Sequence, residues 1–239
     1  MTSRLVALCF DANDPLALAR FWAEALRWEV DDEAQDAIGL VPTDDTRFRI
    51  RFLSFSQKKV GKNRIHLDLT TTSIEDQQET VRTLVSLGAR HIDIGQGPDA
   101  SHVVLADPEG NELCIIEPDN SFLADCGRLG SITCDGSPAV GYFWSAAVGW
   151  SLVWDQEEET AIRAPDGTGP FITWGPPVPP KIAKNRLHLD IATVDGDQRA
   201  EVDRLVSLGA TRIAIGQSDV DRVVMVDPDD NEFCMLRPR

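Results

Sequence analysis

The sequence repeats itself over almost its whole length, and this duplication constrains the fold more than any other feature. Residues 21–28 (FWAEALRW) return at 143–150 (FWSAAVGW), and KNRIHLDL, which begins at Lys62, returns as KNRLHLDI from Lys184. The copies lie about 120 residues apart, a period far longer than the roughly 20–50 residues of solenoid repeats. Each copy is therefore long enough to fold as a domain with its own core. We predict domain 1 over residues 1–118, a linker over 119–130 and domain 2 over 131–239.

The apolar pattern within each copy predicts two βαβββ modules. In the first copy, a strand over residues 4–11 leads to Asp14 and Pro15, which are typical of a helix start, and apolar side chains then recur at helical spacing. Short strands follow, and the same order returns after a strand over 64–69 and a helix over 73–87. We expect an α+β fold in which helices cover one face of each curved mixed sheet. The other face should enclose a cavity.

Composition and charge exclude several classes of protein. There are 23 basic and 39 acidic residues, giving a formal net charge of −16, whereas nucleic-acid binding requires a basic surface. No apolar run approaches the roughly 18 residues of a membrane span. The five cysteines show no paired spacing, which favours reduced thiols. We expect a cytoplasmic protein that binds neither nucleic acid nor membranes.

Several motifs, in the same order in both copies, resemble a known family. FWAEALRW, KNRIHLDL and DPEGNELC, set in paired βαβββ modules, are similar to the vicinal oxygen chelate superfamily, and specifically to its glyoxalase-like branch. The superfamily includes glyoxalase I, extradiol dioxygenases and bleomycin-sequestering proteins. The resemblance implies a small-molecule cavity, in which most of the enzymes hold one divalent metal ion.

The family's metal ligands carry over only in part. His66 and His188 match the histidine that opens the fifth strand of the family domain. Other residues hold the remaining ligand positions: Ala7 and Ser131 on the first strand of each copy, and Cys114 and Cys234 in place of the glutamate. The resemblance therefore implies a degenerate metal site, and we predict no metal ligands and no cofactor. A soft-metal site of Cys9, His66 and Cys114 is the alternative, since thiolate and imidazole bind zinc.

Strand alternation predicts which side chains share the cavity face, because residues two apart point to the same side. The cavity of the first half is expected to contain Cys9, Asp11, His66, Asp68 and Cys114. Its counterpart in the second half is expected to contain Thr133, Asp135, His188, Asp190 and Cys234.

The two histidines allow two interpretations. Either could act as a general base, with Asp68 or Asp190 setting its tautomer and pKa. Alternatively, each histidine bonds across the sheet to Asp11 or Asp135 and has a structural role.

Further side chains are candidates for ligand binding. Arg64 and Arg186 precede the histidine strands, where they could attract an anion or form salt bridges with nearby carboxylates. Trp174, together with Trp154, is a candidate for the wall of a flat apolar pocket.

These observations predict a small-molecule-binding protein with a degenerate metal site, which acts by sequestration or by metal-independent chemistry on an aromatic or anionic ligand. The alternative is a divalent-metal-dependent lyase, isomerase or dioxygenase. A third class is an interaction module with filled cavities. We expect a monomer with intramolecular domain pairing, or a homodimer.

Overall fold

The computed structural model describes residues 2–34, 37–97, 99–194, 196–213 and 222–237. Domain 1 contains two βαβββ modules, as predicted. The first comprises β1 (Ser3–Ala12), α1 (Pro15–Leu26), β2 (Glu29–Ala34), β3 (Ala37–Val41) and β4 (Arg49–Ser54). The second comprises β5 (Ile65–Leu69), α2 (Ile74–Ser86), β6 (Arg90–His91), β7 (Val103–Ala106) and β8 (Glu112–Ile115).

Domain 2 repeats this order. Its first module comprises β9 (Leu129–Asp135), α3 (Pro138–Val148), β10 (Ser151–Gln156), β11 (Glu159–Arg163) and β12 (Phe171–Gly175). Its second comprises β13 (Leu187–Thr193), α4 (Gln198–Ser207), β14 (Thr211–Arg212), β15 (Arg222–Val226) and β16 (Glu232–Leu236). The α+β class is confirmed.

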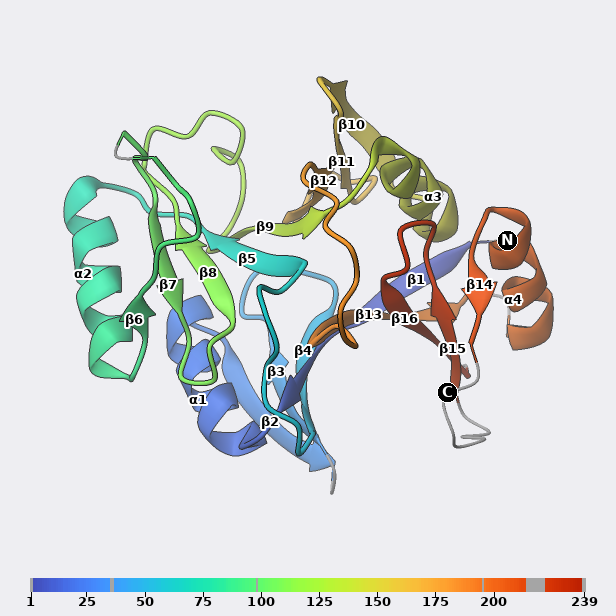
Figure 1. The fold of residues 1–239 in the computed structure, drawn as a ribbon, viewed down its shortest axis with the longest axis horizontal. Helices are drawn as coiled ribbons and strands as arrows, with labels where there is room; N and C mark the ends of the chain where they lie inside the picture. Colours follow the sequence, from blue (N-terminus) through green and yellow to red (C-terminus); the bar gives the residue numbers. More distant parts are fainter. Residues whose placement is uncertain (1, 35–36, 98, 195, 214–221, 238–239) are drawn as a thin grey trace.

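The modules combine across the two halves of the chain (Figure 1). Sheet A has the strand order β14-β15-β16-β13-β1-β4-β3-β2, and sheet B has the order β10-β11-β12-β9-β5-β8-β7-β6. Each sheet therefore takes one module from each domain. Its two modules meet at an antiparallel strand pair, β1 with β13 in sheet A and β5 with β9 in sheet B.

Helices cover one face of each sheet, and we call the opposite face the concave face. Helices α1 and α4 pack on sheet A, and α2 and α3 pack on sheet B. The Asp14 side chain accepts from the Ala17 N–H at the start of α1, and Ser73 caps α2 in the same way, which satisfies helix N–H groups that lack partners within the helix. No helix among the described residues is long and apolar enough to span a membrane. All five cysteines are free thiols.

A tryptophan in each domain joins its first helix to the turn before its last strand. Trp22 on α1 donates from Nε1 to Asp107 at 3.0 Å, and Trp144 on α3 donates to Asp227 at 3.2 Å. The Asp107 carboxylate also accepts from the N–H groups of Glu109 and Asn111. The motifs that mark the repeat are therefore in direct contact, and they fix the two modules of a domain to each other although these belong to different sheets.

Candidate functional site

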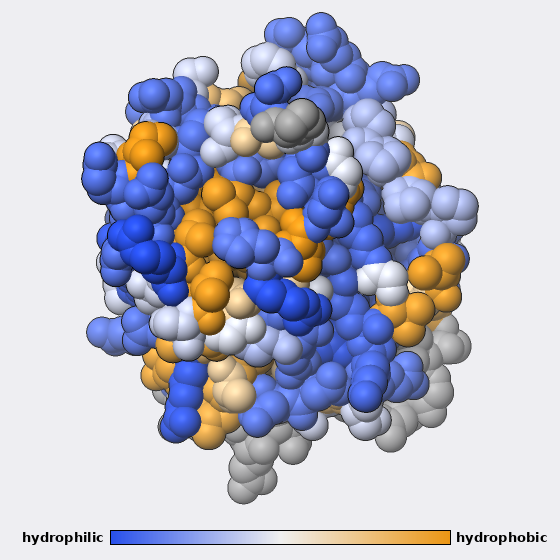
Figure 2. Space-filling model, turned by 60° about the vertical axis from the view of Figure 1, so that its left-hand side comes forward, coloured by the Kyte–Doolittle hydropathy of each residue, from blue (hydrophilic) through white to orange (hydrophobic). Residues whose placement is uncertain are grey.

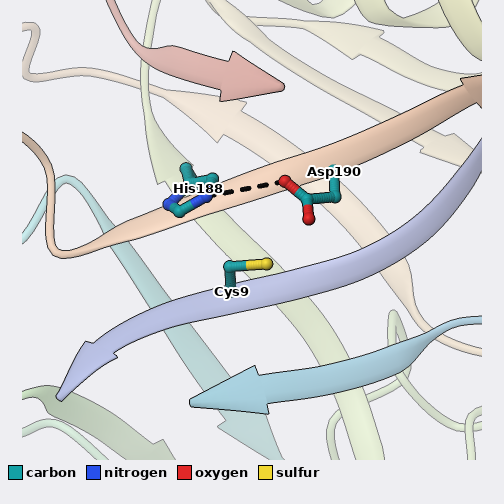
Figure 3. Close-up of side chains that lie close together, drawn as sticks. All are labelled: Cys9, His188 and Asp190. Carbon is teal, nitrogen blue, oxygen red and sulfur yellow. Dashed lines mark ion pairs between the residues drawn. The ribbon is translucent and has the colours of Figure 1, made fainter. Parts of the chain in front are cut away.

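A cluster of cysteine, histidine and aspartate lies on the concave face of sheet A. Cys9 on β1 is opposite Arg51 on β4 and opposite His188 on β13, so three neighbouring strands bring these residues side by side. Figure 3 shows the Cys9 thiol beside the His188–Asp190 pair. His188 Nε2 lies 3.5 Å from Asp190 Oδ1, and one potential ligand atom from each of Cys9, His188 and Asp190 lies within 4.8 Å of the others. All three residues are buried.

Burial and pairing set the charges of this cluster. Burial raises the pKa of the Cys9 thiol to about 12, so the sulfur is protonated at neutral pH. Burial by itself lowers the pKa of His188, whereas its neighbours Cys9 and Asp190 raise it, Cys9 by charge only when its sulfur is a thiolate and Asp190 by a hydrogen bond to the ring. Burial also opposes ionisation of Asp190, yet His188 and Arg51 lower its pKa. The cluster therefore contains a neutral thiol beside an imidazolium–carboxylate pair.

Two polar atoms of the cluster have unused hydrogen-bonding capacity. Within the described residues, neither His188 Nδ1 nor Asp190 Oδ1 has a hydrogen-bond partner, although both are buried. Buried polar atoms in folded proteins are almost always hydrogen-bonded, because an unpaired one costs the free energy of its desolvation. The cluster is therefore incomplete on its own.

Arg51 reaches over the central strand to this cluster. Its guanidinium lies 3.6 Å from Asp190 Oδ2. Strand β1 separates β4 from β13, so the contact passes over β1, where Ala7 is opposite both Arg49 and Asp190. The Arg51 side chain remains 32% exposed. A positive charge therefore lies beside the position at which the family carries its first-strand metal ligand.

The concave face of sheet B holds a related cluster. His66 Nε2 lies 3.4 Å from Asp68 Oδ1, and the other oxygen of Asp68 accepts from Ser131 and Thr133 at 2.6 Å each. Burial by itself lowers the pKa of His66, but Asp68 outweighs it and raises this pKa to about 10. Thr133 stands where sheet A has Cys9, so the second cluster has a hydroxyl network in place of a thiol.

The predicted linker covers the concave face of sheet B. Phe122 stacks on Phe171 of β12 with ring centroids 4.6 Å apart, and Leu123 packs into an apolar cluster that includes Val104 and Cys114. The guanidinium of Arg163 lies over the Phe171 ring, 4.6 Å from its centroid. The chain itself therefore occupies part of this face.

The structure corrects the expected grouping of the cavity residues. Strand alternation placed them on the correct faces, but the two sets exchange partners because β1 pairs with β13 and β5 with β9. Cys9 therefore lies with His188 and not with His66, so the expected set of Cys9, His66 and Cys114 is not brought together. His66 and Cys114 do meet, with Asp68 as the third member, and one potential ligand atom from each lies within 4.8 Å of the others. One face holds Cys9, Asp11, His188, Asp190 and Cys234, and the other holds Thr133, Asp135, His66, Asp68 and Cys114.

The cross-sheet bonds expected of the histidines are not formed. Each histidine pairs with the aspartate two residues along its own strand, while Asp11 pairs with Lys184 and Asp135 pairs with Lys62 at 3.4 Å. The lysines compete successfully because they bring a full charge on a long flexible chain to the end of the strand.

Arg64 and Arg186 join the two domains. Arg186 donates to Glu109 at 2.5 Å and to the Gln57 carbonyl at 2.8 Å, and Arg64 donates to the Asp229 carbonyl at 2.7 Å. Glu109 also accepts from the backbone N–H groups of Asn13 and Asp14 at the start of α1. Arg186 therefore forms a salt bridge with Glu109, but a buried one and not one on the surface, and its Nε has no hydrogen-bond partner among the described residues.

Trp174 is not part of a pocket wall. It is 2% exposed and belongs to the main apolar core on the helix side of sheet B. Its strand places it on the face opposite Thr173, whose hydroxyl donates to Thr133. Trp154 is 39% exposed and makes an edge contact with Phe122.

Surface hollows and apolar surface also occur away from the two clusters. A hollow of about 460 Å³ is lined by residues that include Lys58, Arg90 and Gly110, and one of about 180 Å³ lies between α1 and α2. Apolar residues gather in the middle of the face shown in Figure 2, framed by hydrophilic side chains. Neither hollow includes a residue of the His188 or His66 cluster.

The residues on sheet A do not fit the hard divalent ion of the family. Such ions take several oxygen ligands, whereas the positions implied by the resemblance hold Ala7 and the thiol of Cys234. Arg51 adds a positive charge at the same place. The sulfur, nitrogen and oxygen atoms of Cys9, His188 and Asp190 are a donor set of the kind that a softer ion such as Zn²⁺ takes.

Comparison with known proteins agrees with this architecture. The family described as "Glyoxalase-like domain" matches residues 7–116 and 131–236. The chain therefore belongs to this family and is a tandem-domain protein of the vicinal oxygen chelate superfamily. Comparison with curated proteins gives no significant match.

Two solved structures are similar over most of their length. Glyoxalase I from Zea mays is 13% identical with a TM-score of 0.66, and the alignment covers 99% of this chain and 92% of that one. A candidate dioxygenase from Bacillus subtilis is 12% identical with a TM-score of 0.63, covering 100% of this chain and 86% of that one. At these identities the likeness establishes the fold alone.

Proposed function

We propose that this glyoxalase-like protein binds one small organic molecule on the concave face of sheet A, without a metal ion at the family position. The observation that carries this proposal is the Arg51–Asp190 contact over Ala7. It puts a positive charge beside the place where a metal ion would supply one. In this protein, the Arg51 side chain can therefore hold a ligand group that a metal ion would hold in other members of the family.

The two concave faces differ in what lies at the margin of each cluster. On sheet B, Phe122 of the linker stacks on Phe171 and Leu123 packs into an apolar cluster, while the His66 and Asp68 side chains are 12% and 14% exposed. On sheet A, His188 and Asp190 are only 6% and 4% exposed, but the side chains of Arg49 and Arg51 at the margin are 43% and 32% exposed. The two arginines are therefore the polar groups on sheet A that a ligand can reach from solvent.

The charges of the cluster favour binding over nucleophilic chemistry. Cysteine reacts as a thiolate, and burial keeps Cys9 protonated. A protonated His188 can donate a hydrogen bond or a proton to a bound molecule, but it cannot accept a proton. Sequestration is the function that these residues support best, and acid catalysis by His188 is the chemistry that remains open to them.

A soft-metal-dependent enzyme is the second candidate. The observation that favours it is the convergence of Cys9, His188 and Asp190 to within 4.8 Å. Zn²⁺ bound there would supply a Lewis acid for a carbonyl or water oxygen. Binding would require loss of the Cys9 proton, which burial opposes.

A pair of matched variants tests the location of the site. Ala7→Leu fills the concave face of sheet A, and Ser131→Leu fills the equivalent position of sheet B. A fragment library screened by ligand-observed NMR is expected to give binders that Ala7→Leu abolishes and Ser131→Leu retains. Binders that survive Ala7→Leu, in a variant whose unfolding transition is intact, would contradict the proposal. Ala7→Val is the milder variant if the leucine disturbs folding.

A further inference from the structure

Arg51 has many more hydrogen-bond donors than partners. A guanidinium carries five N–H donors, yet within the described residues Arg51 makes only the 3.6 Å ion pair with Asp190. Arg128 offers a comparison from the same chain, because it donates to the carbonyls of Ala25 and Thr70 and to the Thr80 hydroxyl at 2.8–3.0 Å. Arg51 is therefore not committed to the structure as Arg128 is.

Asp190 is shared by two positive groups. Its Oδ1 faces His188 at 3.5 Å, and its Oδ2 faces Arg51 at 3.6 Å. One carboxylate is thus shared by an imidazole and a guanidinium, while Arg49 on the same strand as Arg51 has its own partner in Asp31 at 3.3 Å.

The unpaired His188 Nδ1 points to the same missing partner. This atom is buried and without a hydrogen-bond partner among the described residues. Asp190 lies on the Nε2 side of the ring, at 3.5 Å, so Nδ1 keeps a free hydrogen-bonding position. An acceptor that also carried a negative charge would pair with Arg51 and could accept from Nδ1.

We propose that the molecule bound on sheet A carries a carboxylate, and that this group pairs with the Arg51 guanidinium and the His188 imidazole. The inference rests on the proposed function, and it adds the chemical class of the ligand. A carboxylate fits because its two oxygens match the planar fork of a guanidinium. Its negative charge also complements the Arg51 guanidinium, which is 32% exposed and has one ion pair among the described residues, at 3.6 Å.

The test compares probes that differ only in charge. Benzoate and benzamide, and acetate and acetamide, are titrated into the ¹⁵N-labelled full-length protein while the Arg51 Nε and His188 ring signals are followed. The carboxylates are expected to shift both signals saturably, and the amides are not. In Arg51→Gln, benzoate should bind about tenfold more weakly or worse, as expected for loss of a hydrogen bond between charged groups. Arg51→Lys, which keeps the charge but loses the fork, should fall between the two.

Arg82→Gln is the matched control. Within the described residues Arg82 pairs only with Glu79, on the surface of α2, and its replacement changes the net charge by the same amount as Arg51→Gln. Equal weakening in this variant would overturn the inference by showing a general charge effect. If benzamide shifts the two signals as strongly as benzoate, the inference fails while the proposed site stands. If none of the probes shifts them, the inference is overturned, and only the fragment screen then decides the proposed function.

Discussion

Arg51 and Asp190 approach to 3.6 Å across strand β1, which links the first module of domain 1 to the last module of domain 2. The contact runs diagonally over β1, since Arg51 is opposite Cys9 and Asp190 is opposite Ala7, and both of these side chains are small. His188 shares the same aspartate. Stability and ligand binding on sheet A therefore depend on one carboxylate.

Asp190→Asn is expected to destabilise the protein strongly. Removing one partner of a buried ion pair costs about 3–5 kcal/mol, because the remaining charge stays buried without compensation. Partial exposure of Arg51 brings our expectation to about 3 kcal/mol in the free energy of unfolding, measured by urea denaturation. The control is Glu79→Gln, which breaks an exposed pair and should cost no more than about 1 kcal/mol. Equal losses in the two variants would contradict this role of Asp190.

His66 is expected to make stability depend on pH in the alkaline range. Its folded-state pKa of about 10 lies above its ordinary value of 6.5. The folded protein therefore holds this proton more tightly than the unfolded chain. The stabilising contribution should be complete below pH 6.5 and disappear as the pH rises through 10.

The measurement is the difference in unfolding free energy between wild type and His66→Gln, from neutral pH to pH 10. Lysines also titrate in this range, but they do so in both proteins, so the difference isolates the contribution of His66. The difference should shrink with rising pH, and the His66 ring signals should still report imidazolium at pH 8. A neutral imidazole at neutral pH would show that the Asp68 pairing is weaker than the structure indicates.

Leu123→Ala should open the concave face of sheet B. The leucine is 5% exposed within the apolar cluster, so its truncation should cost about 3 kcal/mol. The buried thiol of Cys114 lies in the same cluster and should then react faster with a maleimide, as followed by peptide mass spectrometry. Cys234 is the internal control, since it holds the equivalent position in sheet A and its rate should stay unchanged. Equal acceleration of both thiols would indicate general unfolding instead.

Trp22→Phe should weaken the connection between α1 and the Asp107 turn. The substitution keeps an aromatic ring but removes the Nε1 donor to a buried carboxylate, at an expected cost of about 2 kcal/mol. Trp144→Phe should have a similar effect through Asp227. Trp154→Phe, at a half-exposed position, should change the unfolding free energy by less than about 0.5 kcal/mol. Comparable values for all three variants would argue against the hydrogen bonds as the cause.

The sequence predicts the modules and their faces well, because both depend on local periodicity. The helix start at Asp14 and the concave positions of Cys9, His66 and His188 follow directly from residue spacing. Residue spacing does not predict which strand pairs with β1. Both β5 and β13 contain His-Leu-Asp after a nearly identical approach, so β1 has two equivalent candidates and only the packing of the whole chain selects β13.

Two features of the site, the arginines on β4 and the apolar residues of the linker, leave a local pattern in the sequence. Neither composition nor motif comparison detects it. Arg49 and Arg51 alternate in the strand RIRFLS, which places both guanidinium groups on one face. Phe122 and Leu123 are apolar residues within the predicted linker, which is unusual for a solvated connection. Each signal has meaning only once the sheet beneath it is known.

Metal content tests the central claim most directly. Wild type, His188→Ala and His66→Ala are purified without a histidine tag or chelator. Each protein is incubated with Zn²⁺, Ni²⁺, Mn²⁺ and Fe²⁺ in turn and freed of unbound ions. Its metal content is then measured by inductively coupled plasma mass spectrometry. The account predicts substoichiometric metal in all three proteins, because Arg51 and the protonated Cys9 oppose a cation on sheet A. Stoichiometric metal in wild type and His66→Ala that is lost in His188→Ala would contradict it and identify a metal centre at Cys9, His188 and Asp190.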